Sequence, residues 1–163
     1  MSLRGFLNMI HFILKGEMKA KEPILYPIGL VAKMFGISVA TLRLYESEGL
    51  ILPQKSQGQH RSFTEEDIKR IACIRSMITE KGLNLAGVRM VFSALPCWNI
   101  KNCSQEERAS CPAYLDSHDP CWVAKSAESV CATEDCSKCP VYLELSECHT
   151  IKHILKKYWN PAE

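Results

Sequence analysis

Apolar residues recur at helical spacing over residues 28–35 and again over residues 39–47, with a short break between the two stretches. The break begins with Gly36, which accepts the left-handed backbone in which many helices end, and continues to Ser38, a favoured N-cap for a new helix. Two short helices joined by such a turn form a helix-turn-helix, whose second helix enters the major groove of DNA. The pattern therefore predicts a helix-turn-helix in the first third of the chain.

Residues 49–63 change to two short hydrophobic runs around a polar stretch, which predicts a β-hairpin, the wing of a winged helix. Thr64 and Asp67 then have the spacing of a capping box, although Asp stands where Glu or Gln is usual, and they open a helix that runs to Ile78. A further helix follows, capped by Asn84. We expect these two helices to supply most of the core.

The two ends of the chain have different patterns. Apolar residues recur in steps of four and three from Val141 to Tyr158, which predicts an amphipathic helix within residues 141–163 that could pack in its own chain or dimerise. Residues 1–24 carry the apolar stretch Gly5–Leu14, which is too short to span a membrane and has no cleavage motif behind it. We expect these residues to be a disordered N-terminal extension.

Charge divides the chain into two unlike parts. Residues 1–95 carry 13 Lys and Arg against 8 Asp and Glu, a net charge of +5, whereas residues 96–163 carry 7 against 10, a net charge of −3. A basic part favours a polyanionic partner such as DNA. Candidate contacts are Lys55, His60 and Arg61 at the tip of the wing, as donors to phosphate oxygens, and Ser38 at the start of the second helix, nearest the base edges.

Seven cysteines lie within the 43 residues from 97 to 139. Prolines alternate with them, so we expect a loop-rich backbone with too few apolar residues for an independent core. No secretion signal accompanies them, which favours a reducing, cytoplasmic location where bound metal rather than disulfides stabilises the segment. The candidate metal ligands are Cys97, Cys103, Cys111, Cys121, Cys131, Cys136 and Cys139.

The spacing of these cysteines leaves the kind of metal centre open. Cys136 and Cys139 have the C-x2-C spacing of a zinc knuckle, and Cys131 is close enough to join them. Iron-sulfur clusters tolerate wider spacings and often have a Cys-Pro pair at their last ligand, a pair that occurs twice here. We expect an iron-sulfur cluster or zinc, with a thiol-disulfide switch as the alternative. A four-iron cluster would use four thiolates, whereas a binuclear zinc site could use six.

Residues 26 to about 95 resemble the DNA-binding domain of the MerR family of bacterial transcriptional regulators. The resemblance rests on Y-P-I-G-L-V-A-K-M-F-G-I-S-V-A-T-L-R-L-Y-E-S-E-G-L-I-L-P followed by H-R-S-F-T-E-E-D-I-K-R-I. The later segment N-L-A-G-V-R resembles the heat-shock-repressor branch of that family. The two Cys-Trp pairs, Cys97-Trp98 and Cys121-Trp122, resemble the two-CW cysteine-rich domain that is appended to some bacterial signalling proteins.

The resemblance to MerR proteins implies which side chains touch DNA. They are Thr41, Arg43 and Tyr45 of the second helix, with Arg61 and Phe63 of the wing. The guanidinium of Arg43 can bind a phosphate, or a guanine through its O6 and N7 atoms. Many relatives have Arg in place of Lys55 and Tyr in place of Phe63, so the wing contact is expected to be weaker here. Tyr45 and Phe63 could instead be core aromatics.

Together these features predict a mainly α protein. It has a winged helix-turn-helix DNA-binding domain over residues 25–95, a small loop-rich cysteine module over residues 96–140 and a C-terminal helix. The resemblance implies a homodimer on a pseudo-palindromic operator in double-stranded DNA, in contact with RNA polymerase at the promoter. We expect a transcriptional regulator that senses metal or redox state, not an enzyme. The alternatives are a thiol-disulfide oxidoreductase that uses Cys136 and Cys139, or an adaptor with a structural zinc module.

Overall fold

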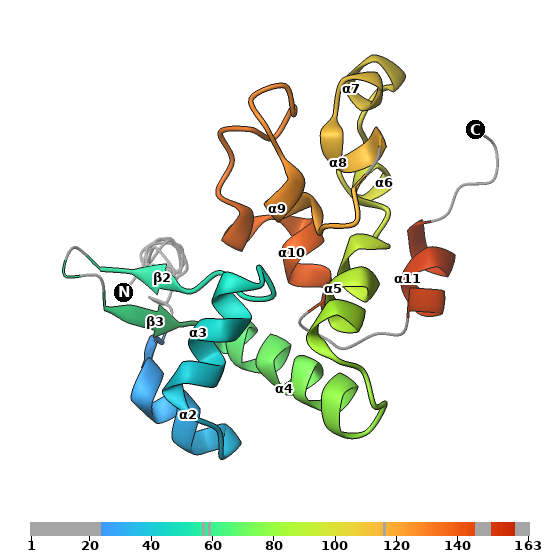
Figure 1. Cartoon of the computed structure of the whole chain (residues 1–163). Coiled ribbons are helices and arrows are strands. Elements are labelled where there is room, and N and C mark those ends of the chain that lie inside the picture. The colour runs from blue at the N-terminus through green and yellow to red at the C-terminus, as the bar shows by residue number, and fades with distance from the viewer. Residues whose placement is uncertain (1–23, 57, 59, 116, 146–150, 159–163) are drawn as a thin grey trace, which may run out of the picture.

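The computed structural model describes residues 24–56, 58, 60–115, 117–145 and 151–158, and it is mainly helical, as predicted. The basic part contains β1 (Tyr26–Pro27), α2 (Ile28–Phe35), α3 (Val39–Ser47), β2 (Gln54–Lys55), β3 (Arg61–Phe63), α4 (Glu65–Thr79) and α5 (Leu85–Ser93). The cysteine-rich part contains α6 (Cys97–Ile100), α7 (Gln105–Ala109), α8 (Pro112–Leu115), α9 (Cys121–Ala124), the 3-10 helix η1 (Cys136–Lys138), α10 (Pro140–Glu144) and α11 (Ile151–Tyr158). In Figure 1 the strands, α2 and α3 lie together at one side, and α6 to α9 form the opposite end.

The predicted helix-turn-helix is confirmed, and local backbone chemistry holds its turn. Gly36 has a φ of 60°, and its N–H donates to the carbonyls of Ala32 and Lys33 at the end of α2. Ser38 has an extended backbone, and its hydroxyl accepts from the N–H of Thr41 at 3.0 Å, which caps α3. The axes of α2 and α3 are bent by 104° at this turn.

A wing hairpin forms in the predicted region, but its first strand lies at Gln54–Lys55, in the polar stretch, and not in the hydrophobic run before it. A third strand completes the sheet. Strand β3 lies between β1 and β2 and is antiparallel to both. Lys55 pairs with Arg61 across the hairpin, and Tyr26 pairs with Phe63 on the other edge of β3. The sequence pattern did not reveal β1, because two residues are too few to display an alternation of apolar and polar positions.

Two side-chain caps set the starts of α4 and α5, as predicted. At α4 the side chain of Asp67 accepts from the N–H of Thr64 at 2.9 Å, and the Thr64 hydroxyl accepts from the N–H of Asp67 at 3.2 Å. At α5 the side chain of Asn84 accepts from the N–H of Gly87 at 2.8 Å. An N-cap of this kind contributes about 1 kcal/mol to stability, so both boundaries follow from local sequence.

The cysteine-rich segment and the winged helix share one hydrophobic core. Trp122, Val141 and Tyr142 are buried in the same cluster as Leu42 and Ile71 of the basic part. The segment has too few apolar residues for a core of its own, and the winged helix supplies the missing surface. The two parts of the sequence are therefore unlike in composition but are packed as one body.

The predicted single helix over residues 141–163 is wrong in its extent. Helix α10 ends at Glu144, and α11 begins at Ile151. Helix α11 folds back onto its own chain: Ile154 is buried in the shared core, and the amide of Asn99 donates to the carbonyl of Tyr158 at 2.8 Å. Val141, Leu145 and Ile154 are buried in the core of their own chain, so apolar positions of this region pack within the chain.

Two further features bear on the predictions for the ends of the chain. Except for Ile24, the predicted N-terminal extension lies outside the described residues. Across the part of the chain that the structure describes, no single helix is long and apolar enough to cross a membrane, although the bent pair of α2 and α3 meets that length and composition together.

Candidate DNA-binding face and cysteine cluster

The start of α3 presents the polar side chains that the sequence assigned to DNA. Ser38 and Arg43 are exposed and Thr41 is partly exposed. The hydroxyls of Ser38 and Thr41 lie 2.9 Å apart, so each is held in place by the other and by the cap of the helix. Arg43 stands one turn into the helix with its side chain in solvent, free to reach a groove or a phosphate.

The wing cations are paired with an acidic residue of α3, the helix that corresponds to the recognition helix of a helix-turn-helix. Lys55 Nζ lies 2.9 Å from Glu46 Oε1, and the guanidinium of Arg61 forms an ion pair with the other carboxylate oxygen. Burial alone would raise the pKa of Glu46, but hydrogen bonds from Arg61 and Lys55 outweigh it and hold that pKa below its usual value. His60 is exposed beside them. Glu46 thus fixes the wing against α3 and keeps both cations beside the candidate DNA-binding face.

Two of the predicted DNA contacts are corrected by the structure. Tyr45 is 2% exposed and Phe63 is 0% exposed, and both belong to the hydrophobic core. Tyr45 faces inward from α3 and Phe63 faces inward from β3, because α3 and the wing need an apolar anchor on the side opposite to DNA. Both aromatics therefore position the DNA-binding face and are not part of it.

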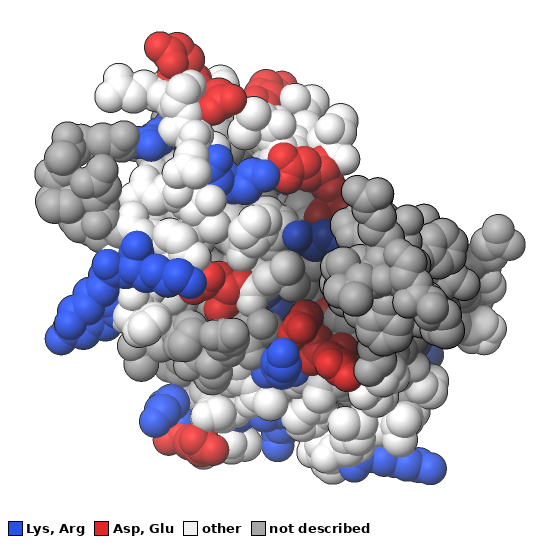
Figure 2. Space-filling model, turned by 180° about the vertical axis from the view of Figure 1, so that it is seen from behind, with Lys and Arg blue, Asp and Glu red and all other residues white. Residues whose placement is uncertain are grey.

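Charge on the surface is mixed at the scale of single side chains. On the face that Figure 2 draws, Lys and Arg are interspersed with Asp and Glu. Attraction between such a surface and DNA depends on a few correctly placed cations, because neighbouring opposite charges offset each other and salt screens exposed charges beyond about 10 Å. Arg43, Lys55 and Arg61 are therefore the groups to test.

All seven predicted cysteines line one small cavity of about 40 Å³. Three of them lie in the short helices α6, α9 and η1 and four in the loops between elements, and each is a partly buried free thiol. Trp122, Val141 and Tyr142 form the apolar wall of the cavity, and Lys101 and Lys125 are also part of its lining. The fold therefore brings together donors that are up to 42 residues apart in the sequence.

The thiols interact with one another and with the two lysines. The interaction between Cys97 and Cys121 lowers the pKa of the Cys97 thiol and raises the pKa of the Cys121 thiol. Lys101 Nζ lies 2.7 Å from Glu134 Oε2, and Lys125 Nζ donates to the carbonyl of Glu134 at 2.9 Å. The lysines thus hold the last cysteine loop and place positive charge beside the thiols.

The thiols converge without forming a coordination shell. Among the described residues, no group of three or more His, Cys, Asp or Glu side chains is arranged to hold a metal ion. The donor type nevertheless suits zinc and iron-sulfur clusters, both of which prefer thiolate sulfur. Binding of a metal here would require the cavity lining to close by small movements of short loops.

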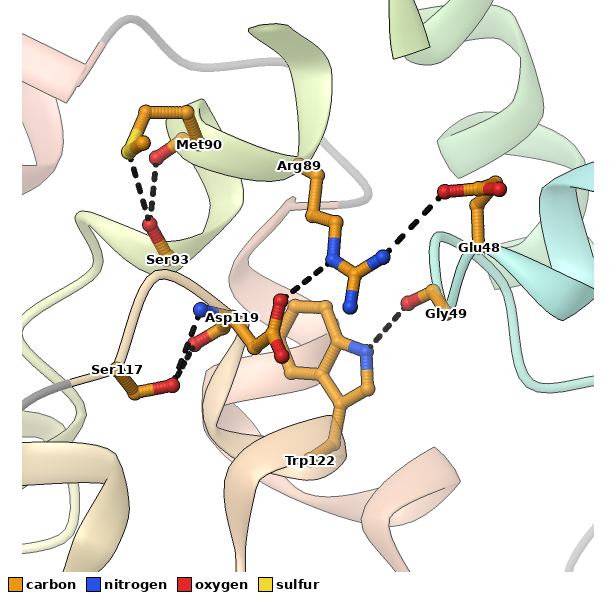
Figure 3. A network of polar contacts seen from close by, with 8 residues as sticks. All are labelled: Glu48, Gly49, Arg89, Met90, Ser93, Ser117, Asp119 and Trp122. Atoms are coloured by element: carbon orange, nitrogen blue, oxygen red, sulfur yellow. Dashed lines mark hydrogen bonds and ion pairs between the residues drawn. The ribbon is translucent and has the colours of Figure 1, made fainter. Parts of the chain in front are cut away.

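Polar contacts join the cysteine-rich part to the end of the recognition helix (Figure 3). The indole N–H of Trp122 donates to the carbonyl of Gly49 at 2.7 Å, directly after α3. Arg89 of α5 links the two parts, with its Nε 2.6 Å from Asp119 Oδ1 and its Nη1 3.3 Å from Glu48 Oε2. A shift of the segment 119–122 would therefore act on the residues that end α3.

A buried cation lies beneath this junction. Arg70 of α4 is 0% exposed, and its guanidinium nitrogens have no hydrogen-bond partner among the described residues. Its Cζ lies 3.5 Å from the ring centroid of Tyr142 and 5.2 Å from that of Trp122. Burial lowers the pKa of Arg70 to about 10, so it is charged at neutral pH, and a negative charge on Cys121 would stabilise it. The π faces of these rings supply most of the attraction that offsets the cost of burying the guanidinium charge.

Tyr142 ties the same region to the wing. Its hydroxyl accepts from the backbone N–H of Leu52 at 2.8 Å and donates to Asp67 Oδ1 at 3.2 Å. No pattern in the sequence indicates these long-range partners, and none singles out Arg70 or Arg89. The one available signal was the tryptophan after Cys121, because a tryptophan in a core usually has a partner for its N–H.

Comparisons with known proteins agree with the geometry of the first half. Residues 26–95 match the family described as MerR HTH family regulatory protein. The HTH-type transcriptional regulator GlnR of Bacillus anthracis is 33% identical over 68 residues, which are 42% of this chain and 52% of that protein. The ZntR homolog of Haemophilus influenzae, also an HTH-type transcriptional regulator, is 30% identical over 92 residues, 56% of this chain and 63% of that protein.

These similarities have a limited extent. The chain spans about half the length of GlnR and less than two thirds of the ZntR homolog. No solved structure matches this one significantly. The family match ends at residue 95, so it covers the winged helix and leaves the cysteine cluster to be interpreted from its own geometry.

Proposed function

Since residues 26–95 form a MerR-family helix-turn-helix domain, we propose that this protein is a DNA-binding regulator of transcription whose cysteine cluster senses metal or redox state. The observation that carries the proposal is an exposed Arg43 on a capped recognition helix, beside a wing that holds Lys55 and Arg61. A homodimer would place two such units on a pseudo-palindromic operator. RNA polymerase at the promoter would be the further partner.

The recognition helix would read bases and the wing would bind the backbone. Arg43 has the donor geometry for guanine, and the wing cations can exchange Glu46 for phosphate without a large movement, because they already lie beside α3. Phosphate contacts of this kind set the register of the protein on the duplex.

Sensing would use the cavity that the seven thiols line. Thiolates there can hold zinc or an iron-sulfur cluster, which supplies a metal-dependent or electron-dependent change of charge. Two routes lead from the cavity to the DNA-binding half: the bond from Trp122 to Gly49, and the interaction between Cys121 and Arg70. Both end on elements that carry or support α3.

Thiol-disulfide chemistry is the second candidate, and one contact favours it. Cys97 and Cys121 interact with each other, so they are a candidate disulfide pair beside the predicted pair Cys136 and Cys139. Oxidation by a peroxide would remove two protons and two electrons from the pair and reduce the peroxide to water. Metal analysis of protein purified without oxygen separates the two candidates.

Arg43→Ala is expected to weaken operator binding by about 10- to 100-fold, because a bidentate contact to a base contributes about 1–3 kcal/mol. The measurement is a mobility-shift titration on a duplex selected from a random-sequence library with the wild-type protein. Lys81→Ala removes a cation from an exposed turn after α4 and is the matched control, expected to bind as wild type does. Wild-type affinity in the Arg43 variant would exclude this residue from the DNA-binding face.

Arg61→Ala is expected to weaken binding evenly across sequences, since a wing contact to phosphate carries no base information. The plot of log affinity against log salt should lose about one unit of slope, the loss expected for one phosphate contact. Binding titrations at four salt concentrations give this slope. If the slope stays that of wild type while Lys55→Ala also leaves it unchanged, the wing does not lie on DNA.

A further inference from the structure

The cysteine-rich segment contains an internal repeat. Residues 96–101 read P-C-W-N-I-K, and residues 120–125 read P-C-W-V-A-K. Residues 103–115 read C-S-Q-E-E-R-A-S-C-P-A-Y-L, and residues 131–143 read C-A-T-E-D-C-S-K-C-P-V-Y-L. Each copy thus has one cysteine after a proline and two more separated by seven residues, the last of them followed by Pro-x-Tyr-Leu. The second copy has a longer connection between its lysine and its second cysteine.

The two copies have matching local structures. In each, the Pro-Cys-Trp sequence begins a four-residue helix, α6 in the first copy and α9 in the second, and the Cys-Pro pair begins α8 or α10. The ring centroids of Trp98 and Tyr114 are 5.1 Å apart with an interplanar angle of 81°. Those of Trp122 and Tyr142 are 5.2 Å apart at 85°. Equal ring geometry at equivalent positions shows that the sequence repeat is also a structural one.

The copies pack against each other reciprocally. Helix α8 of the first copy contacts α9 of the second, and α10 of the second copy contacts α6 of the first. The equivalent side chains of Cys97 and Cys121 interact with each other, and both line the cavity. A reciprocal arrangement of this kind is that of two units related by an approximate two-fold axis, here passing between these two thiols.

Six of the seven thiols around the cavity have an equivalent in the other copy. The equivalent pairs are Cys97 with Cys121, Cys103 with Cys131, and Cys111 with Cys139. Cys136 has none, because the first copy has Arg108 at that position. Cys136 instead hydrogen-bonds to Lys125, and its Sγ lies 3.9 Å from the carbonyl of Glu134. Its surroundings thus differ from those of the six repeated thiols.

We propose that the six repeated cysteines are the ligands of a pair of tetrahedral, thiophilic metal ions such as zinc, with Cys97 and Cys121 as bridging thiolates and Cys136 outside the ligand set. This inference rests on the proposed metal-binding function and deepens it. Two tetrahedral ions need eight ligand bonds, which four terminal and two bridging thiolates supply. The two bridging positions belong at the approximate two-fold axis, where Cys97 and Cys121 meet.

The test uses the full chain, purified without oxygen, loaded with zinc and freed of excess ion. We expect about two zinc ions per chain in the wild-type protein and in Cys136→Ser, and loss of both in Cys97→Ser. Cys103→Ser and its equivalent Cys131→Ser should lose the same amount of zinc as each other. Cys136→Ser is the matched control, because its thiol lines the same cavity as the six others.

A second measurement needs no variant and so does not depend on whether the serine variants fold. Alkylation of the zinc-loaded wild-type protein, followed by peptide mass spectrometry, should modify Cys136 while the six repeated cysteines are protected. Loss of zinc in Cys136→Ser as complete as in Cys97→Ser, or protection of Cys136, would overturn the ligand set but leave metal binding in place. Iron and sulfide bound by four thiolates would overturn the two-ion centre. A wild-type protein that binds no metal would overturn both this inference and the metal-dependent part of the proposed function.

Discussion

Replacing Trp122 with alanine is expected to lower the free energy of unfolding by about 3–5 kcal/mol, the usual cost of removing a buried large aromatic. Trp122 is 7% exposed, donates to Gly49 and lies beside Arg70, so the variant also leaves the Gly49 carbonyl without its donor and removes one of the rings around a buried cation. The midpoint of thermal unfolding should fall by roughly 10 °C, measured by circular dichroism. Both parts of the chain should still unfold together in one transition, because they share the core.

Trp98→Ala is the matched control for this variant. Trp98 occupies the equivalent position in the first copy of the repeat, with the same contact to a tyrosine, but it is only partly buried and lies outside the shared core cluster. We expect it to cost no more than about half as much as Trp122→Ala. Equal losses in the two variants would mean that the packing of the cysteine-rich part on the winged helix adds little stability.

Gly49→Ala is expected to destabilise the protein by about 2–4 kcal/mol and to disturb the junction between α3 and the cysteine-rich part. Gly49 has a φ of +68°, which costs about 1–2 kcal/mol for a residue with a Cβ. The added Cβ would also lie 2.4 Å from Cγ2 of Val123, a contact that requires one of the two segments to move. Chemical denaturation gives the stability, and operator titration reports whether the recognition helix moved.

Two controls divide this cost into its parts. Gly36→Ala changes a glycine with a φ of +60° and open space around it, so it should show the backbone cost alone. Adding Val123→Ala to Gly49→Ala should recover the steric part, because the clashing methyl is gone. If Gly49→Ala costs no more than Gly36→Ala, the cysteine-rich part does not constrain the end of the recognition helix.

The coupling of the two parts has a functional consequence. The bond from Trp122 to Gly49 and the ion pairs of Arg89 join the residues next to Cys121 with the residues that end α3. A ligand that rearranges the thiols can alter DNA affinity only through a difference in free energy between two positions of these elements. Trp122 and Gly49 lie on that connection, so their variants test both stability and regulation.

Local sequence was sufficient for the elements of the winged helix. Gly36, Ser38, Thr64 and Asn84 act on backbone groups within four residues of themselves, and their chemistry is visible without knowledge of the fold. The resemblance predicts that Arg43 faces DNA, and the structure places its side chain on the surface. The contact with DNA itself stays a prediction. The burial of Tyr45 and Phe63 could not be decided from the sequence, since both aromatic types suit a core and a DNA-facing surface equally.

In the cysteine-rich part, local sequence was not sufficient, and the tertiary structure decided which side chains meet. Its residue types pointed to thiolate chemistry, but spacing along the chain favoured Cys136 and Cys139, whereas the thiols in contact are Cys97 and Cys121. Short loops without helical or strand periodicity carry little information about which of their side chains meet. Those meetings depend on long-range packing, in which Trp122 and Tyr142 dock on the winged helix and α11 covers the same core. The sequence by itself determines which reactive side chains are present, while the distances between the thiols depend on contacts between segments far apart along the chain.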